Sequence, residues 1–310
     1  MVKPKVFITR RWPKEAEERL KKIFDVTLNQ DDKVLSNNEI AEGFYNHDAL
    51  ACTVSDTIDE NIIKSGKTGK GTIIAKFGVG FNHIDLNACK KYKILVTNTP
   101  DVLTDATADL TILLMLMVSR RSKEGEYEIE NNKWAGWRPT HLLGSELSHK
   151  TLGIIGFGRI GQAVAKRAYF GFNMKIKYYN RSKKNIDLSF EAEEINNITE
   201  LCKSSDFLSL HCPGGYKNKH LVDHDVLNAM KKTGYLINTA RGDLINEISL
   251  VEALNTNQIA GAGLDVFENE PNINPLFFKA KNLTMLPHLG SATLETRDAM
   301  GNKVFENLKK

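Results

Sequence analysis

The segment Thr151-Leu-Gly-Ile-Ile-Gly156-Phe-Gly158-Arg-Ile-Gly161 decides the fold of much of the chain. Its apolar start predicts a strand, and the residues after it predict an amphipathic helix that leads to a second strand at 174–179. In this context the glycine pattern indicates a dinucleotide-binding unit, although glycines can also serve a strand-to-helix turn without a ligand. Gly156 would allow the tight turn, Gly158 the close approach of a pyrophosphate, and Gly161 the packing of helix on strand. The predicted cofactor contacts here are Gly156, Phe157, Gly158, Arg159, Ile160 and Gly161.

The end of the second strand indicates which dinucleotide is bound. An acidic residue at this point usually holds the ribose 2′-hydroxyl group. This chain instead continues from residue 178 as Tyr-Tyr-Asn180-Arg181-Ser182-Lys183-Lys184. No carboxylate is present to repel a 2′-phosphate, whereas a guanidinium and a hydroxyl that can bind one are. Asn180, Arg181 and Ser182 therefore predict a preference for NADP(H), with use of NAD(H) left open and a solvated loop as the alternative.

Short apolar runs alternate with helical patterns along almost the whole chain, which predicts parallel sheets joined by right-handed crossovers. We expect strands at residues 6–9, 26–28, 49–54, 72–77, 94–97, 152–155, 174–179, 207–210, 235–238, 261–265 and 283–286. We expect helices at residues 13–24, 106–121 and 291–310, whereas residues 123–150 show little regular pattern. The sequence thus predicts an α/β protein with two doubly wound parallel-sheet domains and a cleft between them.

The composition favours a cytoplasmic protein that acts on small molecules. The net charge of +4 on 310 residues is spread over short, mixed stretches, which argues against a nucleic-acid partner. The four cysteines are scattered without a C-x-x-C pair, so a disulfide framework or a metal site is not expected. The start of the chain lacks a signal-peptide pattern, and the most apolar run, 110–118, is too short to cross a membrane.

Three motifs with chemically active side chains follow predicted strands of the second half. They occupy residues 238–243, 263–271 and 286–293. Strand carboxyl ends are where open α/β sheets bind ligands, and these motifs offer Arg241, Glu270 and His288. The guanidinium would bind a substrate carboxylate and polarise a keto oxygen, the imidazole would donate a proton, and the carboxylate would orient the imidazole. Taken singly, the three could equally be an ion-paired arginine, a loop acid and a structural histidine.

Together these motifs resemble the D-isomer-specific 2-hydroxyacid dehydrogenase family over essentially the whole chain, and within it most closely the glyoxylate/hydroxypyruvate reductases. The resemblance implies reduction of a small 2-keto acid to the D-2-hydroxy acid, with Arg241, Glu270 and His288 as the catalytic residues. It implies a flavodoxin-like substrate-binding domain at 1–100 and 290–310, and an NAD(P)-binding Rossmann domain at 101–289.

The resemblance also implies further ligand contacts in both domains. The cofactor contacts that it adds are Thr107, Cys212, Pro213, Thr239 and Asp265. Substrate contacts are implied at Val79, Gly80, Ser291, Trp137 and Arg241. The turn at 78–80 supports this reading independently, because glycines there expose backbone amides that can hold a carboxylate, although such a turn can also serve packing alone.

The stretch around Trp137 predicts the assembly. In the hydroxypyruvate-reducing members of the family, a tryptophan of this arm reaches the active site of the neighbouring subunit, and Trp137 matches it by the Arg138-Pro139 pair that follows. We therefore expect a homodimer with a dimerisation arm at about 120–150. Simple interface packing of Trp137 is the alternative.

Other functions of the same fold remain open. A D-lactate-type, phosphoglycerate or phosphite dehydrogenase is the nearest alternative. Residues 54–57 and 81–83 lack Lys and Arg, which disfavours a phosphorylated substrate. We also expect no C-terminal regulatory extension of the kind found in allosteric phosphoglycerate dehydrogenases. A dinucleotide-sensing corepressor is a further alternative, disfavoured by the three intact catalytic positions.

Overall fold

The computed structural model describes residues 2–182 and 187–310. The chain divides into two compact units. The first unit comprises Met1–Leu103 and Ser291–Lys310, and the second comprises Thr104–Gly290.

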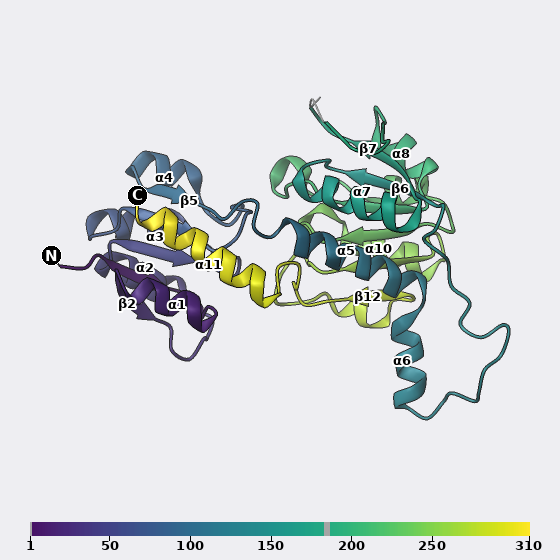
Figure 1. Ribbon diagram of the computed structural model, residues 1–310, viewed down its shortest axis with the longest axis horizontal. Coiled ribbons are helices and arrows are strands. Elements are labelled where there is room, and N and C mark those ends of the chain that lie inside the picture. Colours follow the sequence, from purple (N-terminus) through teal and green to yellow (C-terminus); the bar gives the residue numbers. More distant parts are fainter. Residues whose placement is uncertain (1, 183–186) are drawn as a thin grey trace. The chain divides into compact units, whose positions relative to one another are not determined.

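The first unit is built on a parallel sheet of five strands in the order β2-β1-β3-β4-β5 (Figure 1). Its strands are β1 (Lys5–Ile8), β2 (Asp25–Leu28), β3 (Ala49–Cys52), β4 (Ile73–Lys76) and β5 (Leu95–Thr97). Its helices are α1 (Lys14–Lys21), α2 (Asn37–Asn46), α3 (Glu60–Thr68), α4 (Leu86–Tyr92) and α11 (Leu294–Leu308). The last helix packs on α1, where Gly301 meets Ala16 and Arg19 pairs with Asp298 at 3.2 Å. The C-terminal segment therefore completes the core of the first unit.

The second unit is built on a parallel sheet of seven strands in the order β12-β11-β10-β9-β6-β7-β8. Its strands are β6 (Thr151–Ile155), β7 (Lys175–Tyr179), β8 (Glu193–Glu194), β9 (Phe207–Leu210), β10 (Tyr235–Asn238), β11 (Gly261–Leu264) and β12 (Leu283–Met285). Its α-helices are α5 (Thr104–Ser119), α6 (Ser122–Glu130), α7 (Arg159–Phe172), α8 (Ile198–Ser204), α9 (His224–Ala229) and α10 (Glu247–Asn255). Its 3₁₀ helices are η1 (Tyr216–Asn218), η2 (Gly242–Leu244) and η3 (Pro275–Lys279).

The strand order of the second unit determines where a ligand can bind. Strands β9, β10 and β11 are buried along their whole length, as expected of a sheet covered by helices on both faces. The chain winds outward from β6 to β7 and β8 in one direction, and from β9 to β12 in the other. The order reverses between β6 and β9, so their carboxyl ends border the crevice in which doubly wound sheets bind ligands.

The predicted fold class is confirmed, with two corrections in the second unit. Every strand that the sequence predicts is present, but residues 122–130 form α6 rather than the irregular segment expected there. Helix α6 has no buried residue, so it carries no apolar stripe from which periodicity could reveal it. The two-residue strand β8 was also missed, because both of its residues are exposed glutamates. Figure 1 shows α6 and the irregular segment after it projecting from the rest of this unit.

Three smaller features complete the description. Helix α1 ends at Lys21, earlier than the predicted Phe24, because residues 22–24 turn into β2. Among the described residues, every helix is too short or too polar to cross a membrane. Cys52, Cys89, Cys202 and Cys212 are free thiols.

Candidate active site

The glycine loop joins β6 to α7 with the local geometry that each glycine requires. Gly156 has a φ of 94°, and a Cβ there would lie 2.5 Å from the backbone nitrogen of Cys212. A Cβ at Gly161 would lie 2.5 Å from the Gly156 carbonyl oxygen, so this glycine allows the helix to approach the turn. A Cβ at Gly158 would meet nothing within 4 Å. The loop is therefore crowded toward the protein at Gly156 and Gly161 and open at Gly158.

Helix α7 begins at this open face. Its first intrahelical hydrogen bond runs from the Gln162 amide to the Gly158 carbonyl, at 2.9 Å. The amides of the first turn have no intrahelical acceptors, and the helix dipole adds partial positive charge there. An anion such as a pyrophosphate is stabilised at such a terminus. The Phe157 ring does not share this face, because it stacks in the core on Tyr178 with ring centroids 4.1 Å apart.

The end of β7 lies against the glycine loop through Asn180. Its side-chain oxygen accepts the Phe157 amide at 2.7 Å, which fixes the loop from the position where dinucleotide-binding folds often carry an acid. Its Nδ2 atom is buried and has no partner among the residues that the structure describes. Arg181 and Ser182 follow with exposed side chains, whereas Lys183 and Lys184 lie outside the described residues. The end of β7 thus presents a guanidinium and no carboxylate to solvent.

The loop after β9 forms the opposite side of this crevice. Cys212 is half-buried against Gly156, and burial raises the pKa of its thiol to about 11, so the thiol stays protonated. Burial also lowers the pKa of the preceding His211 to about 3. The exposed Pro213 accepts a hydrogen bond from Asn218 Nδ2 through its carbonyl, at 2.7 Å. The His211 and Cys212 side chains are therefore neutral near pH 7.

The three chemically active side chains are brought together at the carboxyl ends of β10, β11 and β12. His288 Nδ1 lies 2.7 Å from Glu270 Oε2, and both side chains are about 30% exposed. Glu270 Oε1 accepts the Phe267 amide at 2.9 Å. Burial opposes ionisation of Glu270, but the hydrogen bond and charge of His288 outweigh it and hold the pKa of Glu270 below its usual value. Burial lowers the pKa of Arg241, and the nearby charge of Glu270 partly offsets this shift.

Asp265 ties these three loops to one another. Its side chain is fully buried, and its two carboxylate oxygens accept the Leu289 amide at 2.6 Å and the Gly290 amide at 2.8 Å. Its own amide donates to the Asn238 carbonyl, and its carbonyl accepts the His288 amide, both at 2.9 Å. Burial raises the pKa of Asp265 to about 6. This residue therefore sets the position of the histidine loop relative to the strand ends.

Thr107 and Thr239 are buried supports of the same region. The Thr107 hydroxyl donates to the Gly290 carbonyl at 3.0 Å. The Thr239 hydroxyl lies 2.9 Å from that of Thr111 on α5. In this structure both side chains point into the protein, where they hold α5 against the strand ends.

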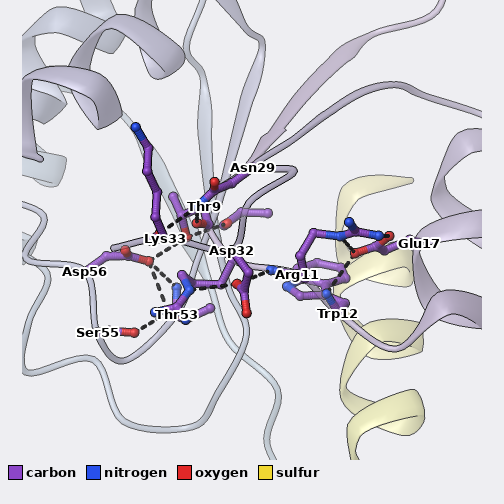
Figure 2. Close-up of polar contacts among 12 residues, drawn as sticks. Thr9, Arg11, Trp12, Glu17, Asn29, Asp32, Lys33, Thr53, Ser55 and Asp56 are labelled. Carbon is purple, nitrogen blue, oxygen red and sulfur yellow. Dashed lines mark hydrogen bonds and ion pairs between the residues drawn. The ribbon is translucent and has the colours of Figure 1, made fainter. Parts of the chain in front are cut away.

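The first unit presents its own polar edge at the carboxyl ends of β1, β3 and β4. Figure 2 shows Asp56 bridging two of these ends, since it accepts the Thr9 hydroxyl and the Thr53 amide, both at 2.6 Å. After the carboxyl end of β4, the backbone amides of Val79 and Gly80 have no hydrogen-bond acceptor among residues 2–182 and 187–310. Such amides can receive a carboxylate.

Two basic side chains also lie at this edge. The buried Lys76 ends β4, and its Nζ would lie 3.2 Å from a Cβ at Gly78. Arg10, which follows β1, pairs with Asp32 at 2.8 Å. The lack of basic residues at 54–57 and 81–83 therefore does not make the edge free of positive charge.

Comparison with known proteins agrees with this geometry. The model of the D-isomer-specific 2-hydroxyacid dehydrogenase NAD-binding domain matches residues 112–290. The glyoxylate reductase of Thermococcus litoralis is 43% identical over 311 residues, which cover 99% of this chain and 93% of that protein. The chain belongs to the D-isomer-specific 2-hydroxyacid dehydrogenase family. It is an NAD(P)-dependent dehydrogenase.

Solved structures of the family have the same fold. A Polaromonas protein assigned to the D-isomer-specific 2-hydroxyacid dehydrogenases has a TM-score of 0.92 at 38% identity, over 99% of this chain and 96% of that one. The NADPH-dependent glyoxylate/hydroxypyruvate reductase of Sinorhizobium meliloti, solved with NADP and malonate, has a TM-score of 0.87 at 31% identity. That match covers 99% of this chain and 93% of the other.

The residues present in this dehydrogenase fit a pyridine dinucleotide. The open position at Gly158 leaves room for a pyrophosphate beside the amides of α7. At the end of β7, positions 180 and 181 carry an asparagine and an arginine rather than an acid. Asn180 Nδ2 is a buried donor that has no acceptor within residues 2–182 and 187–310. A pyrophosphate would therefore fit beside Gly158 and the first turn of α7.

The predicted site residues fall into three groups. Two groups lie within the second unit. One is the cluster of Arg241, Glu270 and His288. The other surrounds the glycine loop and includes Asn180, Arg181, Cys212 and Pro213. Val79, Gly80 and Ser291 belong to the first unit, and the Ser291 carbonyl accepts Arg297 Nε at 3.1 Å. Trp137 lies outside both clusters, 83% exposed on the irregular segment after α6.

Some supporting residues were not predicted. A Cβ at Gly242 would lie 1.9 Å from the Phe267 carbonyl carbon, so the arginine turn and the Glu270 loop are in backbone contact. The only signal in the sequence is that this glycine follows Arg241 directly. The contacts of Asp56 with Thr9 and of Asn218 with Arg181 carry no sequence signal, because the fold brings distant parts of the chain together there.

Proposed function

We propose that this dehydrogenase reduces glyoxylate and hydroxypyruvate to the corresponding 2-hydroxy acids, D-configured where the product is chiral, with NADPH as the preferred reductant. The observation that carries the proposal is the cluster of Arg241, Glu270 and His288 at three adjacent strand ends, with His288 hydrogen-bonded to Glu270. Relatives named glyoxylate reductase, and the NADPH-dependent reductase of Sinorhizobium meliloti, support the substrate class.

Arg241 is proposed to hold the substrate. Its planar guanidinium can pair with a carboxylate and also donate to the adjacent keto oxygen, which draws electron density away from the keto carbon. The half-buried position strengthens such contacts, because little water competes for them. When bound, the reduced nicotinamide supplies a hydride to that carbon.

His288 is proposed to be the proton donor. Glu270 takes the Nδ1 side of the ring, which leaves Nε2 free to donate. The carboxylate stabilises the protonated imidazole, and it stays ionised near neutral pH because its pKa is held low. Nε2–H gives its proton to the alkoxide oxygen that forms, so the ring becomes neutral, and solvent restores the proton through the exposed side.

The remaining substrate contacts are assigned to the first unit. The free Val79 and Gly80 amides can receive the substrate carboxylate, and Ser291 is proposed as a further contact. This makes the first unit the substrate-binding domain and the second unit the NAD(P)-binding domain.

The preference for NADPH is assigned to the end of β7. Arg181 is exposed there, no carboxylate accompanies it, and Ser182 adds a hydroxyl. A guanidinium next to a dianionic phosphate forms a strong charge-assisted contact, which NADH lacks.

Assembly as a homodimer is proposed from the arm. Tyr127, Ile129, Trp134, Trp137 and Leu143 are all largely exposed on α6 and the segment after it. An apolar surface of this kind marks an interaction site. We assign Trp137 to the active site of the second subunit, and expect Trp137→Ala to raise the KM for hydroxypyruvate more than for glyoxylate.

The experiment is absorbance-monitored oxidation of NADPH and NADH with glyoxylate, hydroxypyruvate and pyruvate. Fast turnover of the first two acids with NADPH is expected. Preference for NADH would refute the assignment of Arg181 while leaving the catalytic cluster intact. Turnover of none of these acids would refute the proposed substrate class and redirect the search to phosphite or phosphorylated acids.

A further inference from the structure

The short turn η1, in the loop after β9, contacts Arg181 across the cofactor crevice. Arg181 Nη1 lies 3.4 Å from Asn218 Oδ1, although the two residues are 37 positions apart in sequence. Among residues 2–182 and 187–310, Asn218 is the one side chain that bonds to this guanidinium. The end of β7 and the loop after β9 are thus joined through Asn218, which lies outside the predicted nucleotide-binding motif.

Asn218 is itself held in place by the loop after β9. Its Nδ2 donates to the Pro213 carbonyl at 2.7 Å, and its amide donates to the Gly215 carbonyl at 2.9 Å. Gly215 is anchored in turn, because its amide donates to Asp243 Oδ2 at 2.6 Å. With Nδ2 committed to a carbonyl, Oδ1 must face the guanidinium, so the orientation of the side-chain amide is determined by its partners.

A mobile arginine binds a phosphate less well than a held one. The exposed Arg181 side chain has many rotamers, and binding a 2′-phosphate must restrict them. A neutral acceptor that holds one guanidinium nitrogen restricts them beforehand and leaves the other nitrogens free to donate. A carboxylate in the same place would neutralise the charge and repel the phosphate, whereas the asparagine amide does neither.

We propose that Asn218 is a positioning residue for cofactor selectivity, which holds the Arg181 guanidinium for the 2′-phosphate of NADP(H). The inference rests on the proposed preference for NADPH and deepens it. Its selectivity follows from the chemistry: NAD(H) has a hydroxyl at this position, so holding Arg181 contributes to the binding of one cofactor and not of the other.

The test measures the dissociation constants of NADP⁺ and NAD⁺ by calorimetry, together with kcat/KM for NADPH and NADH. Arg181→Ala should lower the NADP⁺ preference by roughly tenfold to a hundredfold. Asn218→Ala should lower it by roughly three- to fivefold, through NADP⁺ binding and with NAD⁺ binding unchanged. Asn218→Asp should lower it further, since it keeps an acceptor for Arg181 but adds a negative charge.

A double variant isolates the proposed coupling. If Asn218 acts through Arg181, the preference of Arg181→Ala/Asn218→Ala should equal that of Arg181→Ala alone. Asn228→Ala is the matched control, because this asparagine lies on α9 in the same unit and, among the described residues, its side chain hydrogen-bonds to His224 alone. The control should leave both dissociation constants unchanged.

Two results would overturn the inference, and a third would remove its basis. Equal loss of NADP⁺ and NAD⁺ binding in Asn218→Ala would show a role in loop structure alone. Additive effects in the double variant would show that Asn218 acts independently of Arg181. An unchanged preference in Arg181→Ala would instead refute the proposed NADPH assignment itself.

Discussion

Replacing Gly158 by alanine separates the cofactor site from the stability of the fold. Gly158 has extended backbone angles, φ −85° and ψ −162°, and a Cβ there would meet no heavy atom within 4 Å. The substitution therefore introduces neither strain nor a clash. Alanine stabilises by restricting the unfolded chain but is a poorer N-cap of α7 than glycine, so the free energy of unfolding should change by less than about 1 kcal/mol. The added methyl group would instead occupy the space beside the first turn of α7.

The substitution should weaken the binding of the cofactor instead. A pyrophosphate kept away from these amides loses at least one charge-assisted hydrogen bond, which contributes about 1.5–3 kcal/mol. The dissociation constant of NADPH should therefore rise roughly tenfold to a hundredfold. Fluorescence titration of NADPH and urea unfolding monitored by circular dichroism measure the two quantities on the same samples.

Gly156→Ala is the contrasting control. Its φ of 94° is unfavourable for alanine, and its Cβ would lie 2.5 Å from the Cys212 nitrogen, so this variant should lose about 2–5 kcal/mol of stability. An unchanged dissociation constant in a stable Gly158→Ala variant would refute the assignment of the pyrophosphate to this loop.

Three further predictions concern the catalytic region. Glu270→Gln removes the charge beside His288, so kcat should fall roughly tenfold to a hundredfold at an unchanged urea midpoint, and steady-state kinetics that show full activity would contradict the proposed role. Because the pKa of Asp265 is raised to about 6, against about 3.9 unfolded, its contribution to stability should fall by about 2 kcal/mol as pH rises from 4 to 6. Asp265→Asn should lack this fall in urea unfolding at stepped pH. Gly242→Ala drives a Cβ into the Phe267 carbonyl carbon, so thermal unfolding should show a loss of about 1–3 kcal/mol or more.

Much of the fold was predictable because its signals are local. The apolar run before Gly156, the helix after it and the strand ending at Tyr179 were each visible in the sequence, and the structure places all three as expected. Helix α6 was missed for the opposite reason. A helix with no buried residue has no pattern that distinguishes it from a polar loop.

The candidate site was predictable in its chemistry but not in its supports. The sequence places Arg241, Glu270 and His288 after strands, which predicts that these guanidinium, carboxylate and imidazole groups meet, and the structure brings them together. The contact between Asn218 and Arg181 could not be recognised, since it depends on two loops meeting across the sheet. The hydrogen bond from the Phe157 amide to the Asn180 side chain could not be predicted either. The sequence shows only that Asn180 stands where an acid is usual, and not that its side chain holds the glycine loop.

These supports fix the backbones of the loops that carry the candidate catalytic residues. His288 and Glu270 are exposed enough that their mutual hydrogen bond alone would fix them weakly. Their backbones, however, are held by the buried carboxylate of Asp265 and by the close contact between Gly242 and Phe267. A preorganised donor spends no free energy on reordering during the reaction, which is where an enzyme gains most from a rigid framework. The order of the active site thus derives from the same strand-end contacts that close the core of the second unit.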